Sequence, residues 1–144
     1  MGIKEDILSG EFEKAFRHID MDDFEEARQE VMEGAYETED AKFYEFLIYI
    51  IEEHEDSARM HYYASELIMA AFNYISDASH IAFKHARKAI ELAPQDLSLK
   101  EYILLFYEMP DRLLEKSLAV QYARDILQAD PQNQAARQII GELN

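Results

Sequence analysis

One segment of this chain occurs twice, and the repeat is the feature that most constrains the fold. The sequence HARKAIELAPQD at residues 85–96 is matched, thirty-seven positions later, by YARDILQADPQN at residues 122–133. Each copy carries apolar residues at helical spacing and stops at a proline, which cannot continue a helix. Self-similarity at a fixed offset of this size is typical of stacked helical hairpins. Such stacks generally expose grooves that bind other molecules.

Small residues recur at fixed distances before the two loop prolines. Alanine stands at three such positions before Pro94, as Ala82, Ala86 and Ala89, and at the first two before Pro131, as Ala119 and Ala123; Ile126 occupies the third. Without bulk at the crossing, two helix axes can approach to about 8 Å rather than 10 Å. This spacing resembles the second helix of a tetratricopeptide repeat. The first helices and the end of the chain contribute to the resemblance through Leu67, Ala70, Ala71 and Tyr74, through Ile103, Leu104 and Tyr107, and through Ile140-Gly141 in a final capping helix.

The resemblance covers about residues 64–144 and implies a fold. We expect an all-α, right-handed stack of antiparallel helical hairpins, a tetratricopeptide-like superhelix of about eight helices. Residues 64–144 are then the repeats with a C-terminal capping helix, and residues 1–63 are a diverged acidic helical half. No linker separates the two parts, so residues 1–144 are predicted to form a single domain, a size at which one core suffices.

Glycine and proline are scarce, with four and three residues respectively, so helix is favoured almost everywhere. Helices are expected near residues 3–19, 23–36, 41–54, 57–75, 79–93, 97–108, 112–129 and 133–143. Short polar side chains can accept hydrogen bonds from the free amides of a first helical turn. On this basis the predicted caps are Asp40, Asp56, Asp96, Asp111 and Asn133.

Two features of the composition indicate a cytoplasmic protein. The amino terminus, MGIKED, has neither a basic region nor an apolar signal core, and no stretch reaches eighteen apolar residues. The chain has no cysteine, which fits a reducing compartment and removes disulfides and thiolate chemistry.

Charge is unevenly distributed along the chain. Residues 1–56 hold nineteen acidic and five basic residues, a net charge of −14, whereas residues 57–144 carry only −2 of the total −16. Such runs are either a solvated face or a docking surface that steers a basic protein partner. The negative field repels phosphate backbones and anionic lipids, so we expect no nucleic-acid and no membrane binding. The carboxylates expected to contact a partner are Asp22, Asp23, Glu25, Glu26, Glu52, Glu53 and Glu55.

An aromatic segment, FYEFLIYII at residues 43–51, lies between two of the acidic runs. Its apolar positions exceed one helical stripe, so this helix is either sandwiched between neighbours or partly exposed at a binding groove. An aromatic floor flanked by carboxylates is a common form of interface hot spot.

Tetratricopeptide proteins that capture a terminal carboxylate carry lysine and asparagine on the exposed groove face of their first helices. The resemblance places Ile68, Phe72, Glu101 and Leu105 at those positions, so that clamp is absent. Apolar and acidic groove positions instead suit a helix or loop with apolar anchors and basic flanks.

No motif indicates catalysis, a cofactor or a metal. None of the five histidines forms a His-x-x-x-His pair or follows a glutamate by three residues. There is no phosphate-binding glycine loop and no Gly-x-Ser-x-Gly elbow. We therefore expect a protein that is not an enzyme and has no cofactor.

The predicted function is a non-catalytic module that binds a basic or apolar-anchored protein segment. The alternative is an inhibitor resembling the immunity proteins that neutralise basic nuclease toxins by tight binding. A hydrolase that uses unrecognised carboxylates is the third possibility, and it would show a pH-dependent turnover. Neither the oligomeric state nor the partner follows from the sequence.

Overall fold

The computed structural model describes residues 2–142, and every regular element in that range is helical. The elements are α1 (Lys4–Leu8), α2 (Phe12–Arg17), the 3₁₀ helix η1 (Met21–Asp23), α3 (Glu25–Thr38), α4 (Lys42–Glu53), α5 (Ala58–Ala71), α6 (Ala78–Leu92), α7 (Leu97–Ile103), α8 (Leu105–Glu108), α9 (Lys116–Ala129) and α10 (Gln134–Gly141). The predicted all-α class is confirmed.

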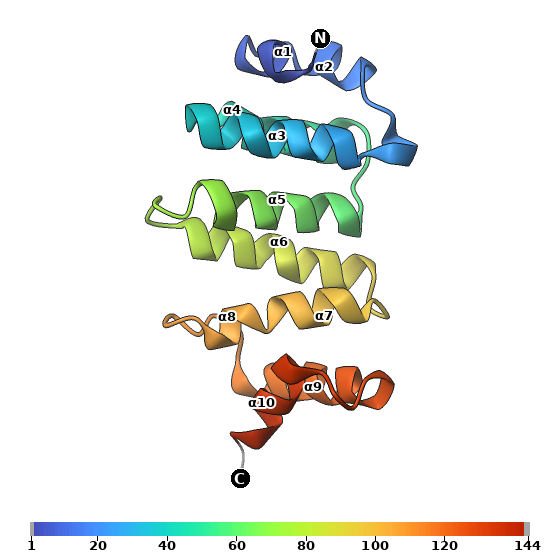
Figure 1. The fold of residues 1–144 in the computed structure, drawn as a ribbon, viewed down its shortest axis with the longest axis vertical. Coiled ribbons are helices and arrows are strands. Elements are labelled where there is room, and N and C mark those ends of the chain that lie inside the picture. Colours follow the sequence, from blue (N-terminus) through green and yellow to red (C-terminus); the bar gives the residue numbers. More distant parts are fainter. Residues whose placement is uncertain (1, 143–144) are drawn as a thin grey trace.

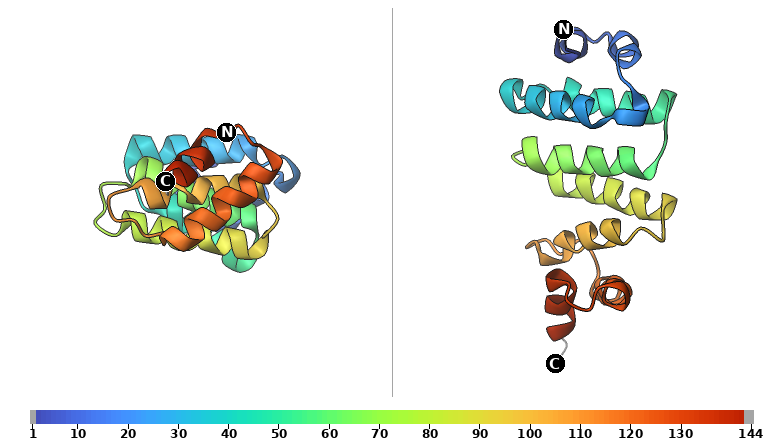
Figure 2. Two further views of the ribbon diagram at one scale, coloured as in Figure 1. Left: turned by 90° about the horizontal axis from the view of Figure 1, so that it is seen from below. Right: turned by 45° about the vertical axis from the view of Figure 1, so that its right-hand side comes forward.

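The helices form successive layers along the long axis of the molecule, in chain order (Figure 1). The two ends of the chain therefore lie at opposite ends of the stack, as the right-hand view of Figure 2 also shows. Helix α4 packs on α5, α5 on α6, α6 on α7, α7 on α9, and α9 on α10. One hydrophobic cluster runs through all layers from Ile3 to Ile139. The right-handed superhelical twist stays a prediction.

The two copies of the repeated segment have the same local structure. Helix α6 ends before Pro94 and α9 ends before Pro131. After each proline, a backbone amide closes an equivalent turn: Asp96 N donates to Ala93 O at 3.1 Å, and Asn133 N donates to Asp130 O at 3.1 Å. The six small-residue positions, Ala82, Ala86, Ala89, Ala119, Ala123 and Ile126, are all buried. The structure therefore buries all six positions of the pattern.

Two expected helices are interrupted. The helix expected at 3–19 is divided into α1 and α2 around Gly10, whose φ of 81° lies in the left-handed region that glycine tolerates. The helix expected at 97–108 divides at Leu104, where hydrogen bonds join residues three apart: Leu104 N to Glu101 O at 3.2 Å and Tyr107 N to Leu104 O at 3.0 Å. Hydrogen bonds of this kind tighten a helix locally into a 3₁₀ turn.

Three of the five predicted caps are confirmed as acceptors for a following backbone amide. Asp96 accepts from Ser98 N, Asn133 from Ala136 N, and Asp40 from Lys42 N, at 2.9–3.0 Å. The other two predictions are wrong. Ser57 caps α5 instead of Asp56, and Glu115 precedes α9, which begins four residues later than expected. In the described part of the chain, no helix is long and apolar enough to cross a membrane.

Candidate functional site

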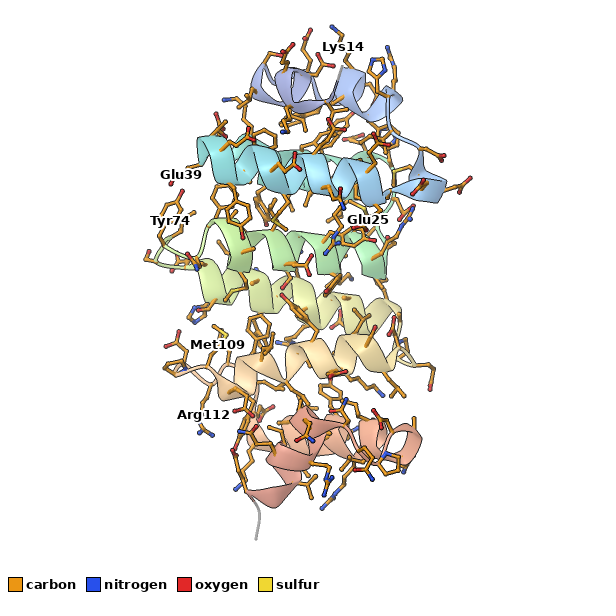
Figure 3. The ribbon with its side chains drawn as sticks, in the orientation of Figure 1. Lys14, Glu25, Glu39, Tyr74, Met109 and Arg112 are labelled. Atoms are coloured by element: carbon orange, nitrogen blue, oxygen red, sulfur yellow. The ribbon has the colours of Figure 1, made fainter. Side chains whose placement is uncertain are left out.

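The first acidic run lies at the start of α3. Asp22, Asp23 and Glu26 are exposed, while Glu25 forms an ion pair with Arg28 at 3.2 Å. Glu25 lies at the opposite end of α3 from Glu39 (Figure 3). Negative charge is stabilised at a helix N-terminus by the helix dipole. The fold therefore supplies a structural reason for these carboxylates.

Glu55 also has a structural partner. Its carboxylate accepts hydrogen bonds from Arg59 Nε at 2.7 Å and from the Ser57 hydroxyl at 2.7 Å. These hydrogen bonds, that of Arg59 foremost, lower the pKa of Glu55. Arg59 also donates to the Met21 carbonyl at 2.7 Å, so it holds η1 against the start of α5. Glu55 therefore helps to position Arg59 within the fold.

The predicted exposure of Ile68 and Phe72 is wrong. Both side chains belong to the core, with exposed fractions of 3% and 1%. Helix α5 is packed against α3, α4 and α6, and a shift of one residue rotates a helical position by about 100°. Half-buried positions of α5 lie close to Ile68 in the sequence, including Glu66 and Met69.

Glu101 and Leu105 are exposed, as predicted. Leu105 is 54% exposed and lines a hollow of about 230 Å³ between α5 and α7–α8. Met69 and Met109 are also part of its apolar lining. The structure therefore separates the four predicted groove positions, because two are in the core and two face solvent.

A different hollow brings carboxylates and apolar side chains together on α4. We call it the acidic hollow; its volume is about 480 Å³ and its lining residues are Phe12, Tyr44, Glu45, Ile48, Tyr49, Glu52 and Glu53. Residues three, four and seven positions apart share one helix face, which places Glu45, Ile48, Tyr49 and Glu52 in one stripe. The opposite face of α4 buries Phe43, Phe46, Leu47 and Ile50. This explains why the aromatic segment exceeds one apolar stripe.

The wall of the acidic hollow is held by a network between α2 and α4. Tyr49 donates a hydrogen bond from its phenol to Glu13 Oε1, and His54 Nε2 lies 2.8 Å from the same oxygen. The His54 ring also stacks on Phe16, with ring centroids 3.6 Å apart. Phe12 packs on Tyr49 with centroids 5.8 Å apart. The apolar floor is therefore fixed before any partner binds.

The same network explains two pKa shifts. The hydrogen bonds from Tyr49 and His54 lower the pKa of Glu13, which stays ionised. The bond to Glu13 raises the pKa of Tyr49 to about 12. A phenol with such a pKa is a poor general acid or base near neutral pH. The hollow therefore supplies an apolar surface and fixed negative charge, which suit binding better than proton transfer.

Among the residues that the structure describes, the carboxylates at the edge of the hollow have no cationic partner. Within residues 2–142, neither Glu45, Glu52 nor Glu53 has a cationic group within 4.0 Å. Glu52 and Glu53 also lie in the last turn of α4, which contains no basic residue. Negative charge is unfavourable at a helix C-terminus. A cationic ligand would supply the missing ion-pair partner and would offset the repulsion between these carboxylates and the helix C-terminus.

The sequence prediction identified Glu52 and Glu53 but missed Glu45 and Phe12. Glu45 has a sequence signal, because it lies seven residues before Glu52 and both flank the apolar face of one helix. Phe12 has none, because it reaches the site from α2 through the tertiary fold.

No cluster of three or more potential ligands with metal-binding geometry is present among residues 2–142. In comparisons with known proteins, no family model matches the chain and no curated protein is similar to it.

Proposed function

We propose that this chain is a non-catalytic protein-binding module of the cytoplasm, and that the acidic hollow receives a basic segment with an apolar anchor. The observation that carries the proposal is the placement of Glu52 and Glu53. These two carboxylates lie beside an apolar floor, at the helix end where negative charge costs stability, and no cationic group of residues 2–142 pairs with them. The fold supplies no reason for them, whereas a basic partner does.

The apolar floor of the hollow is the surface on which the partner's apolar anchor packs. Ile48 and Tyr49 are half-buried and lie at the centre of the stripe that Glu45 and Glu52 flank. Burial of apolar area is the main favourable contribution to association. Carboxylates at the edge of an interface contribute to association rate and to partner choice more than to affinity.

The exposed carboxylates Asp22, Asp23 and Glu26 have a second role in this proposal. They contribute to the −14 charge of residues 1–56, whose field acts beyond direct contact. We assign them to long-range attraction of the partner and assign contact to the acidic hollow.

A resemblance to tetratricopeptide proteins supports the same proposal, because those proteins bind other proteins. Their mode of binding a terminal carboxylate does not transfer, since Ile68 and Phe72 are buried in the core and the two exposed positions carry Glu101 and Leu105 instead of lysine and asparagine.

An immunity-type inhibitor is the second candidate, and the concentration of charge on one part of the chain favours it. Such an inhibitor binds a folded basic enzyme very tightly, with an association rate that falls steeply as salt rises. An adaptor binds a short peptide with micromolar affinity and weaker salt dependence. The two candidates share the acidic hollow and differ in the size of the partner.

Site-specific crosslinking in the native cell tests the proposal. A photoreactive amino acid is placed at Ile48, at the centre of the hollow, and in a control protein at Gln138, which is exposed on α10. We expect one basic protein to be crosslinked through position 48 and not through position 138. Equal crosslinking at both positions, or crosslinking of acidic proteins only, would contradict the proposal.

A further inference from the structure

A second, larger hollow lies beside the acidic one. Its volume is about 590 Å³, and it shares Tyr44 with the acidic hollow. The inner wall is formed by Tyr44 of α4, His61 of α5 and His85 of α6. We call it the histidine hollow. Its chemistry differs from that of the acidic hollow, because its edge carries the cations Lys84, Arg87 and Lys88 of α6.

Four side chains of the histidine hollow form a continuous chain of hydrogen bonds. The Tyr44 hydroxyl is 2.8 Å from His85 Nε2, the two Nδ1 atoms of His85 and His61 are 2.9 Å apart, and His61 Nε2 is 2.7 Å from Asp56 Oδ1. An ionised carboxylate can only accept hydrogen bonds, so His61 Nε2 carries a proton. When both imidazoles are neutral, His61 Nδ1 accepts a hydrogen bond from His85 Nδ1, and His85 Nε2 accepts one from the Tyr44 hydroxyl.

The surroundings favour this neutral arrangement near pH 7. Burial, with the charges of His61 and Lys84 as smaller causes, lowers the pKa of His85 to about 4. Burial also raises the pKa of Tyr44. In the neutral chain the phenolic proton is therefore directed inward to His85, and the inner wall presents only the oxygen of Tyr44 to the hollow.

The two histidines can take up one proton between them, and this reverses the direction of hydrogen-bond donation between Tyr44, His85 and His61. If His61 carries both ring protons, its Nδ1 donates to His85 Nδ1, and His85 Nε2 then donates to the Tyr44 oxygen. The Tyr44 O–H is released and points into the hollow. A second proton would leave two N–H groups facing each other across 2.9 Å, so the chain holds only one.

The edge of the hollow has the charge that an anion requires. Within residues 2–142 neither Lys84 nor Arg87 forms an ion pair, whereas Lys88 is 3.9 Å from Glu91. Lys84, Arg87 and Lys88 share one face of α6, because they are three and four residues apart. Asp56 and Glu91 are the carboxylates of the lining, so three cations face two anions. One added proton gives the hollow a further positive charge.

We propose that the histidine hollow binds one small monovalent oxyanion, a carboxylate or dihydrogen phosphate. As the anion binds, the hydrogen-bonded pair of His61 and His85 takes up one proton from solvent. The anion accepts hydrogen bonds from the outward Tyr44 hydroxyl and from Lys84 and Arg87. Its charge stabilises the protonated imidazole pair. The proposal does not rest on the proposed protein-binding function, because Glu45, Glu52 and Glu53 take no part in anion binding, although Tyr44 lines both hollows.

Nuclear magnetic resonance of the histidine ring protons tests the proposal. Sodium acetate or sodium phosphate is added to the intact protein at about pH 7 and about pH 5.5, with sodium chloride at equal ionic strength as reference. We expect saturable shifts of His61 and His85, and none of the exposed His18 and His80. Affinity should rise by up to about tenfold per unit fall in pH, since one proton is taken up. Acetate and phosphate are titrated separately, which shows which oxyanion the site prefers.

Two variants separate anion binding from a general effect of pH. Lys84→Gln with Arg87→Gln alters only exposed side chains, and should abolish the saturable shifts while the fold is retained. Tyr44→Phe removes the outward hydroxyl, and should weaken binding at the lower pH. The proposal is overturned if neither acetate nor phosphate shifts His61 and His85 more than chloride does, or if affinity does not depend on pH. Unchanged binding in the Lys84 and Arg87 double variant would also overturn it.

Discussion

The phenol of Tyr49 on α4 donates a hydrogen bond to the carboxylate of Glu13 on α2. The same oxygen of Glu13 lies 2.8 Å from His54 Nε2, so one carboxylate joins the short second helix to both the middle and the end of α4. Helix α2 has only six residues, which is too short to be stable without such contacts. This contact therefore holds one wall of the acidic hollow.

Replacing Tyr49 with Phe should loosen α2. The ring still packs on Phe12, but Glu13 loses the hydrogen bond that most lowers its pKa. We expect faster hydrogen exchange of the α2 amides and a lower free energy of unfolding. Tyr36→Phe is the matched control, because Tyr36 is 58% exposed. Equal exchange rates in the Tyr49→Phe variant and the native protein would show that the hydrogen bond does not hold α2.

Replacing Ala86 or Ala123 with Leu should overpack the helix contacts. Both residues are buried, with exposed fractions of 3% and 0%. Added bulk in a well-packed core costs about 1–3 kcal/mol. Denaturant midpoints provide the measurement, and Ala129→Leu provides a control at an exposed position of α9. Unchanged midpoints for Ala86→Leu and Ala123→Leu would mean that the repeat contacts tolerate large residues, against the small-residue pattern.

Gly34 should not tolerate a methyl group. An added Cβ would overlap the ring of Phe43, which is fully buried and cannot withdraw into solvent. Alanine gains about 1 kcal/mol of helix propensity over glycine, whereas overpacking costs about 1–3 kcal/mol. Gly34→Ala should therefore lower the melting temperature. Gly141→Ala on α10, where an added Cβ meets no atom of residues 2–142 within 4 Å, should not lower it. Equal effects of the two substitutions would contradict the close contact of Gly34 with Phe43.

The stability of the fold should decrease as the pH is lowered, and His85 should cause part of this decrease. Its pKa is lowered from 6.5 to about 4 in the folded protein, so between these values the unfolded chain binds a proton that the folded chain does not. The free energy of unfolding therefore decreases as the pH falls through that window. His85→Gln should give a flatter dependence, and His80→Gln, at an exposed position, should leave the slope unchanged. Measurements need buffers without carboxylate or phosphate. An unchanged slope for His85→Gln would contradict the lowered pKa.

Local signals in the sequence were sufficient to predict most of the fold. The prolines at 94 and 131 set the ends of α6 and α9, and Asp96 and Asn133 cap the helices that follow. These features act within a few residues of one another, which is why a sequence shows them. The break at Gly10 was not predicted, because an isolated glycine is compatible with a continuous helix as well as with a turn.

The candidate site was predicted only in part. Glu52 and Glu53 were identified from charge, yet charge alone could not separate them from Glu55, which is held by Arg59. That difference depends on tertiary contacts. Ile68 and Phe72 were assigned to the groove through a repeat register, and an error of one residue turns a helical position from the surface into the core. The pairing of His61 with His85 had no sequence signal, because the two residues lie on different helices.

Association kinetics with the protein crosslinked through position 48 test the central claim most directly. Three variants are compared. The triple variant combines Glu45→Gln, Glu52→Gln and Glu53→Gln, and the second variant is Ile48→Ala. The control combines Asp22→Asn, Asp23→Asn, Glu25→Gln and Glu26→Gln. Rates are measured as salt rises from about 50 to 500 mM, where the Debye length shrinks from about 14 Å to about 4 Å.

We expect the triple variant to associate more slowly and to lose part of its salt dependence, because the remaining acidic residues still attract the partner. Ile48→Ala should dissociate faster, because the floor that holds the partner's apolar anchor is reduced. The control should slow association at low salt only and leave dissociation unchanged. Native association and dissociation rates in both the triple variant and Ile48→Ala would contradict the assignment of the acidic hollow as the contact surface.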